Sequence, residues 1–224
     1  MQLQTLMADY YKGLRITPSL YHEVDYGIHI ELGEDIYQMH EDGKLNMKRF
    51  TTIYKQIHAI FPLLFNKDEE VLLIANTYPM NIHKTAYPNF FQRTVKAQQK
   101  KFALRTQEFS WLFDEEPIRV QQMELSCNMS ELKIESLLKS VIHEDFGALK
   151  PQLRKKFSVY APDIFLINKR TKCIFHLYDD RGCEMINADE TLHNELVEAL
   201  KDWDIQVKSS PKNRKDFSES LDNA

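Results

Sequence analysis

A continuous apolar run at Glu70–Thr77 constrains the fold more than any other feature of this sequence. The run reads EVLLIANT, has the length of a strand and contains neither proline nor glycine. Successive side chains of a strand point to opposite faces, so a strand that is apolar at nearly every position must be covered on both faces. The run therefore predicts a central strand of a sheet that has a layer of structure on each side.

Other segments have the patterns of strands and helices that would surround this strand. Apolar residues alternate with polar ones over Glu23–Leu32, which predicts a half-buried strand. Apolar residues at helical spacing predict a helix over Met47–Phe61. Shorter helices are expected over Thr5–Leu14 (ended by Pro18), over Asn89–Lys101, and from Asn128 or Ser130 to His143. Two further strands are expected over Phe102–Phe109 and Ile118–Cys127, around an acidic turn at Asp114–Pro117, and loops over Asn81–Pro88 and Lys150–Lys156.

The C-terminal part of the chain predicts a β-meander followed by a capped helix. Three short strands are expected over Asp163–Asn168, Lys172–Asp179 and Cys183–Ile186. Asn187, with Glu190 three residues later, predicts the N-terminal cap of the last helix. We therefore expect a single α+β domain over residues 1–208, with a mixed, largely antiparallel sheet and helices packed against it. Residues 209–224 have the composition of a disordered tail.

Charge and composition limit the environment of the protein. The net charge of −4 gives no global attraction to nucleic acid or to an anionic membrane. No apolar run approaches the roughly 20 residues that a membrane-spanning helix needs, and the N-terminus does not have the pattern of a signal peptide. Cys127, Cys173 and Cys183 are expected to be reduced and buried. These features together predict a cytoplasmic protein.

Motifs of the common enzyme classes are missing from the sequence. It contains no GxxxxGK[ST], no GxGxxG after a strand, no HExxH and no GxSxG, and its six glycines are few for a phosphate-binding loop. His143-Glu144-Asp145, with Asp163 or Asp180, is a conceivable metal site, but adjacent helical residues point in different directions. We therefore expect neither a metal nor a cofactor, and expect His143 to lie at a helix C-terminus, where the macrodipole favours it.

The stretch Phe175–Glu184, FHLYDDRGCE, predicts a β-hairpin with its turn at Asp179–Gly182. Asp at the first turn position and Gly at the fourth are typical of a type I turn with a bulge, so Asp179 and Gly182 are expected to be structural. With the loop at Asp180–Gly182, Tyr178 is expected to face Glu184 across the hairpin. One face is then apolar, and the other carries three polar side chains: His176, Tyr178 and Glu184.

Turn geometry does not demand Asp180 and Arg181, and these two residues are therefore the candidate binding residues. They are expected at the hairpin tip, beside His176, Tyr178 and Glu184. Histidine, glutamate and tyrosine can exchange protons, and arginine can bind a phosphate or a carboxylate. Three interpretations remain open: a binding site, a catalytic site, or an Asp–Arg pair that only rigidifies the hairpin.

Two groups of basic residues are a further candidate surface. If they converge, they would suit an acidic protein or a phosphate ligand; otherwise they form solvated surface. The groups are Arg93, Lys96, Lys100 and Lys101, and Lys150, Arg154, Lys155 and Lys156.

Several blocks of the chain resemble a known family. They are GIHIELG at Gly27–Gly33, FPLLFNKDEEVLLIANTYP at Phe61–Pro79, ALKPQL at Ala148–Leu153 and PDIFLINKRTKCIFHLYDDRGCEMI at Pro162–Ile186. On these residues the chain resembles a bacterial family of unknown function whose mark is a Tyr-Asp-Asp-Arg-Gly turn near the C-terminus. The resemblance extends to about Lys208 and implies a bacterial cytoplasmic protein. By analogy it also suggests an immunity- or antitoxin-like binder.

Two functions from different classes follow. The first is a non-catalytic module that binds a partner protein, such as a bacterial toxin or a phage or defence component. The lack of catalytic motifs and the 10 Tyr and 13 Phe favour it, because aromatic residues commonly carry interface energy. The alternative is a hydrolase or transferase acting on a phosphate-bearing ligand through Asp180 and Arg181 with His176, Tyr178 and Glu184.

Overall fold

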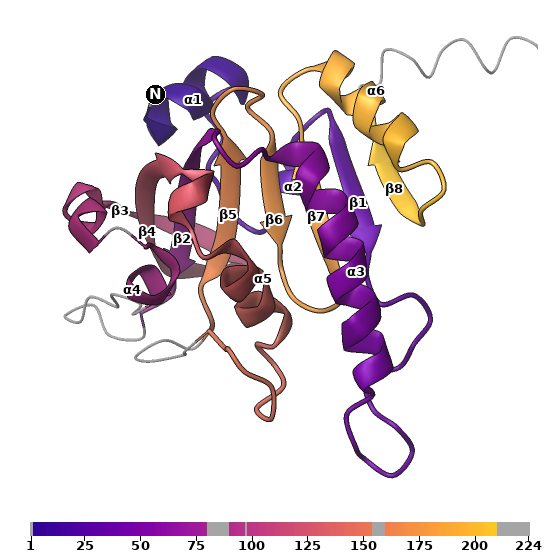
Figure 1. The fold of residues 1–224 in the computed structure, drawn as a ribbon. Helices are drawn as coiled ribbons and strands as arrows, with labels where there is room; N and C mark the ends of the chain where they lie inside the picture. The colour runs from indigo at the N-terminus through magenta and orange to yellow at the C-terminus, as the bar shows by residue number, and fades with distance from the viewer. Residues whose placement is uncertain (1, 80–89, 97, 154–159, 210–224) are drawn as a thin grey trace, which may run out of the picture.

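An eight-stranded antiparallel sheet forms the centre of the computed structural model, which describes residues 2–79, 90–96, 98–153 and 160–209 (Figure 1). The strand order is β3-β4-β2-β5-β6-β7-β1-β8, and every neighbouring pair is antiparallel. The strands are β1 Gly27–Glu31, β2 Glu70–Thr77, β3 Arg105–Phe113, β4 Glu116–Asn128, β5 Asp163–Asn168, β6 Ile174–Leu177, β7 Gly182–Ile186 and β8 Ile205–Lys208.

Helices cover both faces of this sheet. They are α1 Leu3–Tyr10, α2 Leu20–Glu23, α3 Met47–Leu64, α4 Phe90–Thr94, α5 Ile134–Ile142 and α6 Glu190–Ala199, with 3₁₀ turns at Gln98–Ala103 and Met129–Glu131. Figure 1 shows α3, α5 and α6 on the near side of the sheet, with α1 and α2 behind it. We call the near side the front face and the other side the rear face. The structure confirms the predicted α+β class.

β2 is an interior strand, the third in the strand order, as its apolar run predicts. Its bounds are Glu70–Thr77, and its last seven residues are buried. Leu73 lies in the front core with Phe50 of α3, whereas Leu72 lies in the rear core with Leu6 of α1. The continuous apolar pattern therefore reflects one core on each face of the sheet.

Near the N-terminus two predicted elements are shorter in the structure. The helix expected over Thr5–Leu14 is α1, which ends at Tyr10, because Lys12 (φ 55°) and Gly13 (φ 75°) adopt left-handed backbone conformations. Pro18 therefore does not end it. The strand expected over Glu23–Leu32 is shortened to β1, because Glu23 belongs to α2 and residues 24–26 connect that helix to the strand.

The predicted helix Asn89–Lys101 is wrong as a single element. It is divided into α4 and a 3₁₀ turn, because Val95 forms a β-bridge with Leu132 and the Lys96 N–H donates to the Glu131 carbonyl (2.8 Å).

The next two strands, β3 and β4, are longer than expected, and the acidic turn between them has only two residues. These residues, Asp114 (φ 48°) and Glu115 (φ 67°), both have left-handed conformations, as a type I′ turn requires.

The predicted cap of the last helix was also wrong. The N-cap of α6 is Asp189, whose carboxylate accepts the Leu192 N–H (3.0 Å), and not Asn187. Asn187 is buried and lies beside His193 of α6. The capping box that the structure does contain joins Asn128 to Glu131 at the 3₁₀ turn before α5. The sequence did not predict β8, which pairs with β1.

Some predictions fall on residues that the structure does not describe. The loop Asn81–Pro88, residues 154–156 of the basic loop and the tail beyond residue 209 belong to these. The single-domain division stays a prediction. Cys127, Cys173 and Cys183 are free and buried, as expected. No helix among the described residues is long and apolar enough to cross a membrane.

Candidate functional site

The hairpin formed by β6 and β7 has a register that differs by two residues from the predicted one. His176 pairs with Glu184, and Leu177 pairs with Cys183, so five residues from Tyr178 to Gly182 connect the paired positions. The predicted pairing of Tyr178 with Glu184 is therefore wrong. A shift of two residues keeps every side chain on its face, because side chains alternate with a period of two. The predicted apolar face accordingly lies in the front core, and His176 and Glu184 share the rear face.

Within the connection, Asp179 and Gly182 both make structural contacts, but Gly182 does not have the left-handed conformation that the predicted bulge requires. Asp179 accepts the Arg181 N–H through Oδ1 (2.7 Å) and the Arg181 Nε–H through Oδ2 (2.8 Å). At Gly182 a Cβ atom would approach the Ile30 carbonyl oxygen to 2.7 Å and collide with the Tyr178 hydroxyl. Only glycine fits there without displacing β1 or the Tyr178 ring.

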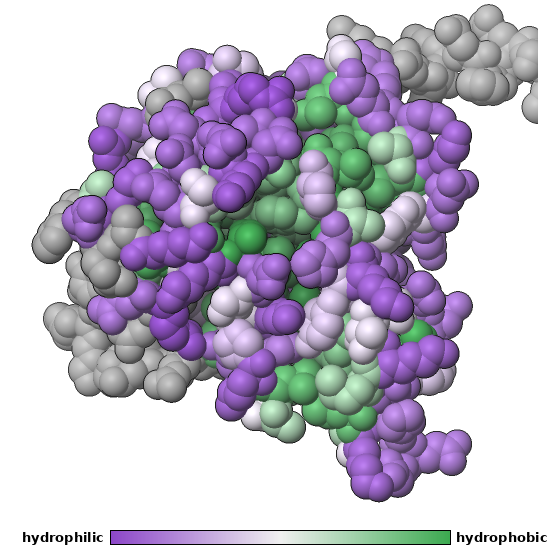
Figure 2. Space-filling model, in the orientation of Figure 1, coloured by the Kyte–Doolittle hydropathy of each residue, from purple (hydrophilic) through white to green (hydrophobic). Residues whose placement is uncertain are grey.

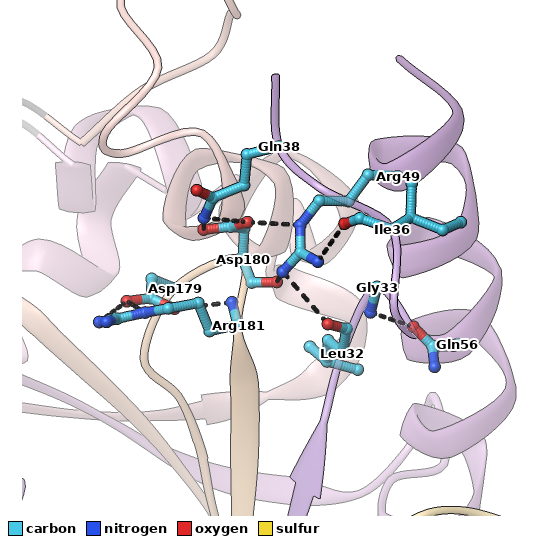
Figure 3. Close-up of polar contacts among 9 residues, drawn as sticks. All are labelled: Leu32, Gly33, Ile36, Gln38, Arg49, Gln56, Asp179, Asp180 and Arg181. Carbon is cyan, nitrogen blue, oxygen red and sulfur yellow. Dashed lines mark hydrogen bonds and ion pairs between the residues drawn. The ribbon is translucent and has the colours of Figure 1, made fainter. Parts of the chain in front are cut away.

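Asp180 lies in the turn of the hairpin, but its side chain is buried. Only 2 % of the residue is exposed, and its carboxylate points toward α3, where Arg49 Nε donates to Oδ2 (2.9 Å) (Figure 3). The amide of Gln38 donates to both carboxylate oxygens, at 3.1 and 3.0 Å. Arg49 also donates to the Ile36 carbonyl (2.8 Å) and to the Asp180 carbonyl (2.9 Å).

These contacts form a clamp, by which we mean Arg49, Asp180, Leu32, Ile36 and Gln38 (Figure 3). The clamp joins the hairpin to α3 and to the segment that follows β1. Its arginine is 7 % exposed, and its charge and donors are matched by one carboxylate and three carbonyls. The interactions of Asp180 are therefore structural.

Sequence reasoning missed Arg49. A signal was present: Arg49 stands four residues before Ile53 and eight before Ile57, so it lies at the edge of the apolar face of α3. An arginine at such a position needs a buried acceptor. The sequence offers several carboxylates, and only the tertiary structure identifies Asp180.

The other polar residues of the hairpin lie on the rear face. His176 Nδ1 is 3.3 Å from Glu184 Oε2, and His29 Nδ1 is 3.9 Å from Glu184 Oε1. Tyr178 stacks on the His29 ring, with a centroid distance of 5.9 Å. Burial acts to raise the pKa of Glu184, but hydrogen bonds from His176 and His29 outweigh it, and the pKa is lowered.

Asp163 of β5 lies beside this group. Burial raises its pKa, against the opposing effects of His176 and of a hydrogen bond from the Tyr78 hydroxyl. His176 also stacks on Phe165 at 4.2 Å, and its Nε2 atom is buried without a hydrogen-bond partner among the described residues. The five predicted binding residues are thus divided. Asp180 contacts α3, the Arg181 side chain is exposed, and His176, Tyr178 and Glu184 lie together on the rear face.

The conceivable metal ligands do not form a site. His143 caps the C-terminus of α5, as expected, and its ring nitrogens contact the Tyr54 hydroxyl and the Pro151 carbonyl (2.9 Å). Burial lowers the pKa of His143, and its Nδ1 donates to the Pro151 carbonyl. The part of the chain that the structure describes contains no group of three or more His, Cys, Asp or Glu placed to hold a metal ion.

The two basic segments come together at Gln152. Arg93 donates to its carbonyl (3.1 Å), and Lys150 donates to its side-chain oxygen (2.8 Å). Lys96 and Lys100 instead bind the Ser130 carbonyl and Glu131. The patch remains a prediction, because Arg154, Lys155 and Lys156 fall outside the described residues and the Lys101 side chain is not described.

An aromatic cluster that the sequence did not predict lies where β2, β3 and the segment before β5 meet. The cluster comprises Tyr78, Trp111, Phe113 and Tyr160. Neighbouring ring centroids are 5.4 Å apart for Trp111–Phe113, 6.1 Å for Phe113–Tyr160, 5.9 Å for Tyr160–Tyr78 and 6.3 Å for Tyr78–Trp111. Two members remain exposed, Phe113 by 41 % and Tyr160 by 46 %, and the adjacent Leu112 is exposed by 67 %.

The front face has an apolar groove between α3 and α5. Figure 2 shows apolar surface between these helices, surrounded by hydrophilic side chains. The groove has a volume of about 160 Å³, and Ile57, Phe61, Ile134 and Leu138 contribute to its lining. It is small beside the ligand pockets of roughly 300–1,000 Å³ that are usual for small molecules.

Comparisons with known proteins agree with the family resemblance. The model of the family described as "Domain of unknown function (DUF3885)" matches residues 3–206. The chain is 32 % identical over 211 residues to the "Uncharacterized protein YnaE" of Bacillus subtilis (strain 168), covering 91 % of this chain and 97 % of that protein. No solved structure matches the chain.

Proposed function

The chain belongs to the family described as Domain of unknown function (DUF3885), and from its geometry we propose that it is a non-catalytic module that binds a partner protein. The observation that carries the proposal is the aromatic cluster, two of whose rings, Phe113 and Tyr160, remain exposed. Tryptophan, tyrosine and phenylalanine provide large rigid contact areas and are enriched in the central parts of protein interfaces. Two neighbouring exposed aromatic rings cost free energy in water, and a partner would bury them.

The proposed partner is a bacterial toxin or a phage or defence component. The net charge of −4 would favour a partner with a basic surface, because complementary charge speeds association. The three buried free thiols fit a reducing compartment, so we place this function in the cytoplasm. A toxin, phage or defence gene next to the gene for this chain would support this class of partner.

The alternative, a hydrolase or transferase, has less support. It required Asp180 and Arg181 to act together with His176, Tyr178 and Glu184, yet the Asp180 carboxylate is already bound by Arg49 and Gln38. A panel of phosphoester substrates tests it. Turnover that is lost in the Arg181→Ala variant would favour the enzyme over the binding module.

The binding proposal is tested by affinity purification of the tagged full-length chain from its own bacterium, followed by quantitative mass spectrometry. We expect a partner that is enriched with the wild type and lost with the double variant Trp111→Ser/Phe113→Ser. The matched control is Tyr37→Ser, which removes an aromatic ring that is 85 % exposed elsewhere on the surface. Equal enrichment with the double variant, or no enriched protein with the wild type, would refute the proposal.

The turn Tyr178–Gly182 remains a proposed mark of the family. The clamp gives a physical reason for retaining its third residue, since Asp180 is the carboxylate that binds Arg49. A survey of relatives tests this idea: Asp180 and Arg49 should be kept or replaced together.

A further inference from the structure

β3 forms one end of the sheet, and no strand of the described residues covers its outer edge. All nine of its residues pair with β4 on the inner side. Within the described ranges, 2–79, 90–96, 98–153 and 160–209, no second strand pairs with it. Backbone N–H and C=O groups along the free side of an edge strand are ready to pair with another strand.

β3 has few of the features that protect natural edge strands from such pairing. It reads RTQEFSWLF and contains no proline and no glycine. The residues with left-handed backbone conformations, Asp114 and Glu115, follow the end of the strand. The charge of Glu108 is matched within the sheet by Arg119 (2.6 Å). The opposite edge strand, β8, is only four residues long and ends on a lysine. Short strands and edge lysines discourage edge-to-edge association.

We propose that a second copy of this chain pairs its β3 with β3 of the first copy, antiparallel and centred on Phe109. This register lets all nine residues of both strands pair. On one face Phe109 meets Phe109, Gln107 meets Trp111 and Arg105 meets Phe113 of the other copy. On the other face Glu108 meets Ser110, and no like charges lie directly opposite each other.

Charge and ring chemistry select this register. Arg105 beside an exposed phenylalanine ring gives a cation–π pair twice in the dimer, and aromatic cross-strand pairs add to stability. Moving the centre by one residue to position 108 would place Glu108 opposite Glu108, which is unfavourable. Moving it to position 110 would leave Arg105 without an opposite residue.

The dimer deepens the proposed function and rests on it for its biological role. The two sheets become continuous, and both aromatic clusters lie on the same face. The two Phe113 residues are eight residue steps apart along the paired strands, or about 26 Å at roughly 3.3 Å per residue. The dimer therefore presents two recognition surfaces, which strengthens binding to a partner that also has two sites.

The test uses the full-length chain and two variants of one exposed residue. Ser110→Glu places a carboxylate opposite Glu108 in both symmetric pairs, whereas Ser110→Lys places an ammonium there. We expect a dimer of the wild type in analytical ultracentrifugation, at twice the chain mass of 26.5 kDa. Because the change acts twice, the dissociation constants of the Glu and Lys variants should differ by at least about tenfold, with the Glu variant weaker.

Cysteine cross-linking checks the register. In this register position 109 lies opposite itself, so a Phe109→Cys chain should form a disulfide-linked dimer under mild oxidation. A Thr106→Cys chain, with position 106 opposite Leu112, should not. A wild type that remains monomeric at high concentration, a dimer that responds equally to both Ser110 variants, or cross-linking at position 106 and not at 109 would overturn the proposal.

The two proposals fail separately. A monomer whose partner is still lost with Trp111→Ser/Phe113→Ser would overturn the dimer and leave the binding function intact. A β3-linked dimer that captures no partner would overturn the binding function and leave the dimer intact.

Discussion

Replacing Arg49 by methionine should destabilise the protein far more than the same change at Arg181. Each arginine forms an ion pair with an aspartate of the same turn, but the Arg49 side chain is 9 % exposed and that of Arg181 is 68 % exposed. Arg49→Met leaves the Asp180 carboxylate buried with only the Gln38 amide as a side-chain donor, and it removes the donor from three carbonyls. Removing one partner of a buried pair costs about 3–5 kcal/mol, whereas an exposed pair contributes about 0–1 kcal/mol.

Urea unfolding of the wild type and both variants measures the difference. A loss of about 3 kcal/mol also lowers the melting temperature by roughly 6–12 °C for a chain of this size. The double variant Arg49→Met/Asp180→Leu should recover part of the loss, because it leaves no uncompensated charge. If Arg49→Met and Arg181→Met destabilise equally, the clamp is not the structural element that we infer.

Three further predictions follow from local geometry. Gly33→Ala should lower the free energy of unfolding by at least about 2 kcal/mol, because Gly33 has φ 86° and a Cβ atom there would collide with the Arg49 guanidinium. The control is Gly43→Ala, which should cost only about 1 kcal/mol, because Gly43 has a similar φ of 76° but open space around it. Glu184 has a lowered pKa, so its contribution to stability is present above its ordinary value of 4.5 and lost as the pH falls through the folded value. The difference in unfolding free energy between wild type and Glu184→Gln should shrink on acidification below 4.5, and a constant difference would contradict the role of His176. Asp189→Ala should destabilise the protein by about 1 kcal/mol, measured by thermal unfolding, and no effect would place the α6 cap elsewhere.

Much of the element content could be predicted because hydrophobic periodicity is a local property. Glu70–Thr77 and Asp163–Asn168 have the predicted bounds, and the helix predicted from Met47 begins there. The prediction of a helix over Asn89–Lys101 was wrong because Val95 and Lys96 bind the segment before α5, whose residues are distant in the sequence. Local propensity competes with such contacts and does not reveal them.

In the candidate site, too, local patterns were predictable and long-range contacts were not. The faces of His176 and Glu184 followed from alternation, but their register did not, since a slip of two residues preserves alternation. Asp180 was predicted as a binding residue because turn geometry leaves it unexplained; the structure explains it by Arg49, 131 residues away. The aromatic cluster combines rings from three separate segments, and no spacing in the sequence unites them.

The sequence alone determined most of the strands and helices and which of their side chains share a face, because these follow from periods of about 2 and 3.6 residues along the chain. Only the tertiary structure decided which strands are neighbours, and therefore that β3 is an edge strand among the described residues. It also decided which carboxylate neutralises the buried arginine. Pairing and burial join residues that are distant in sequence, and the pattern around each residue contains no information about its distant partner.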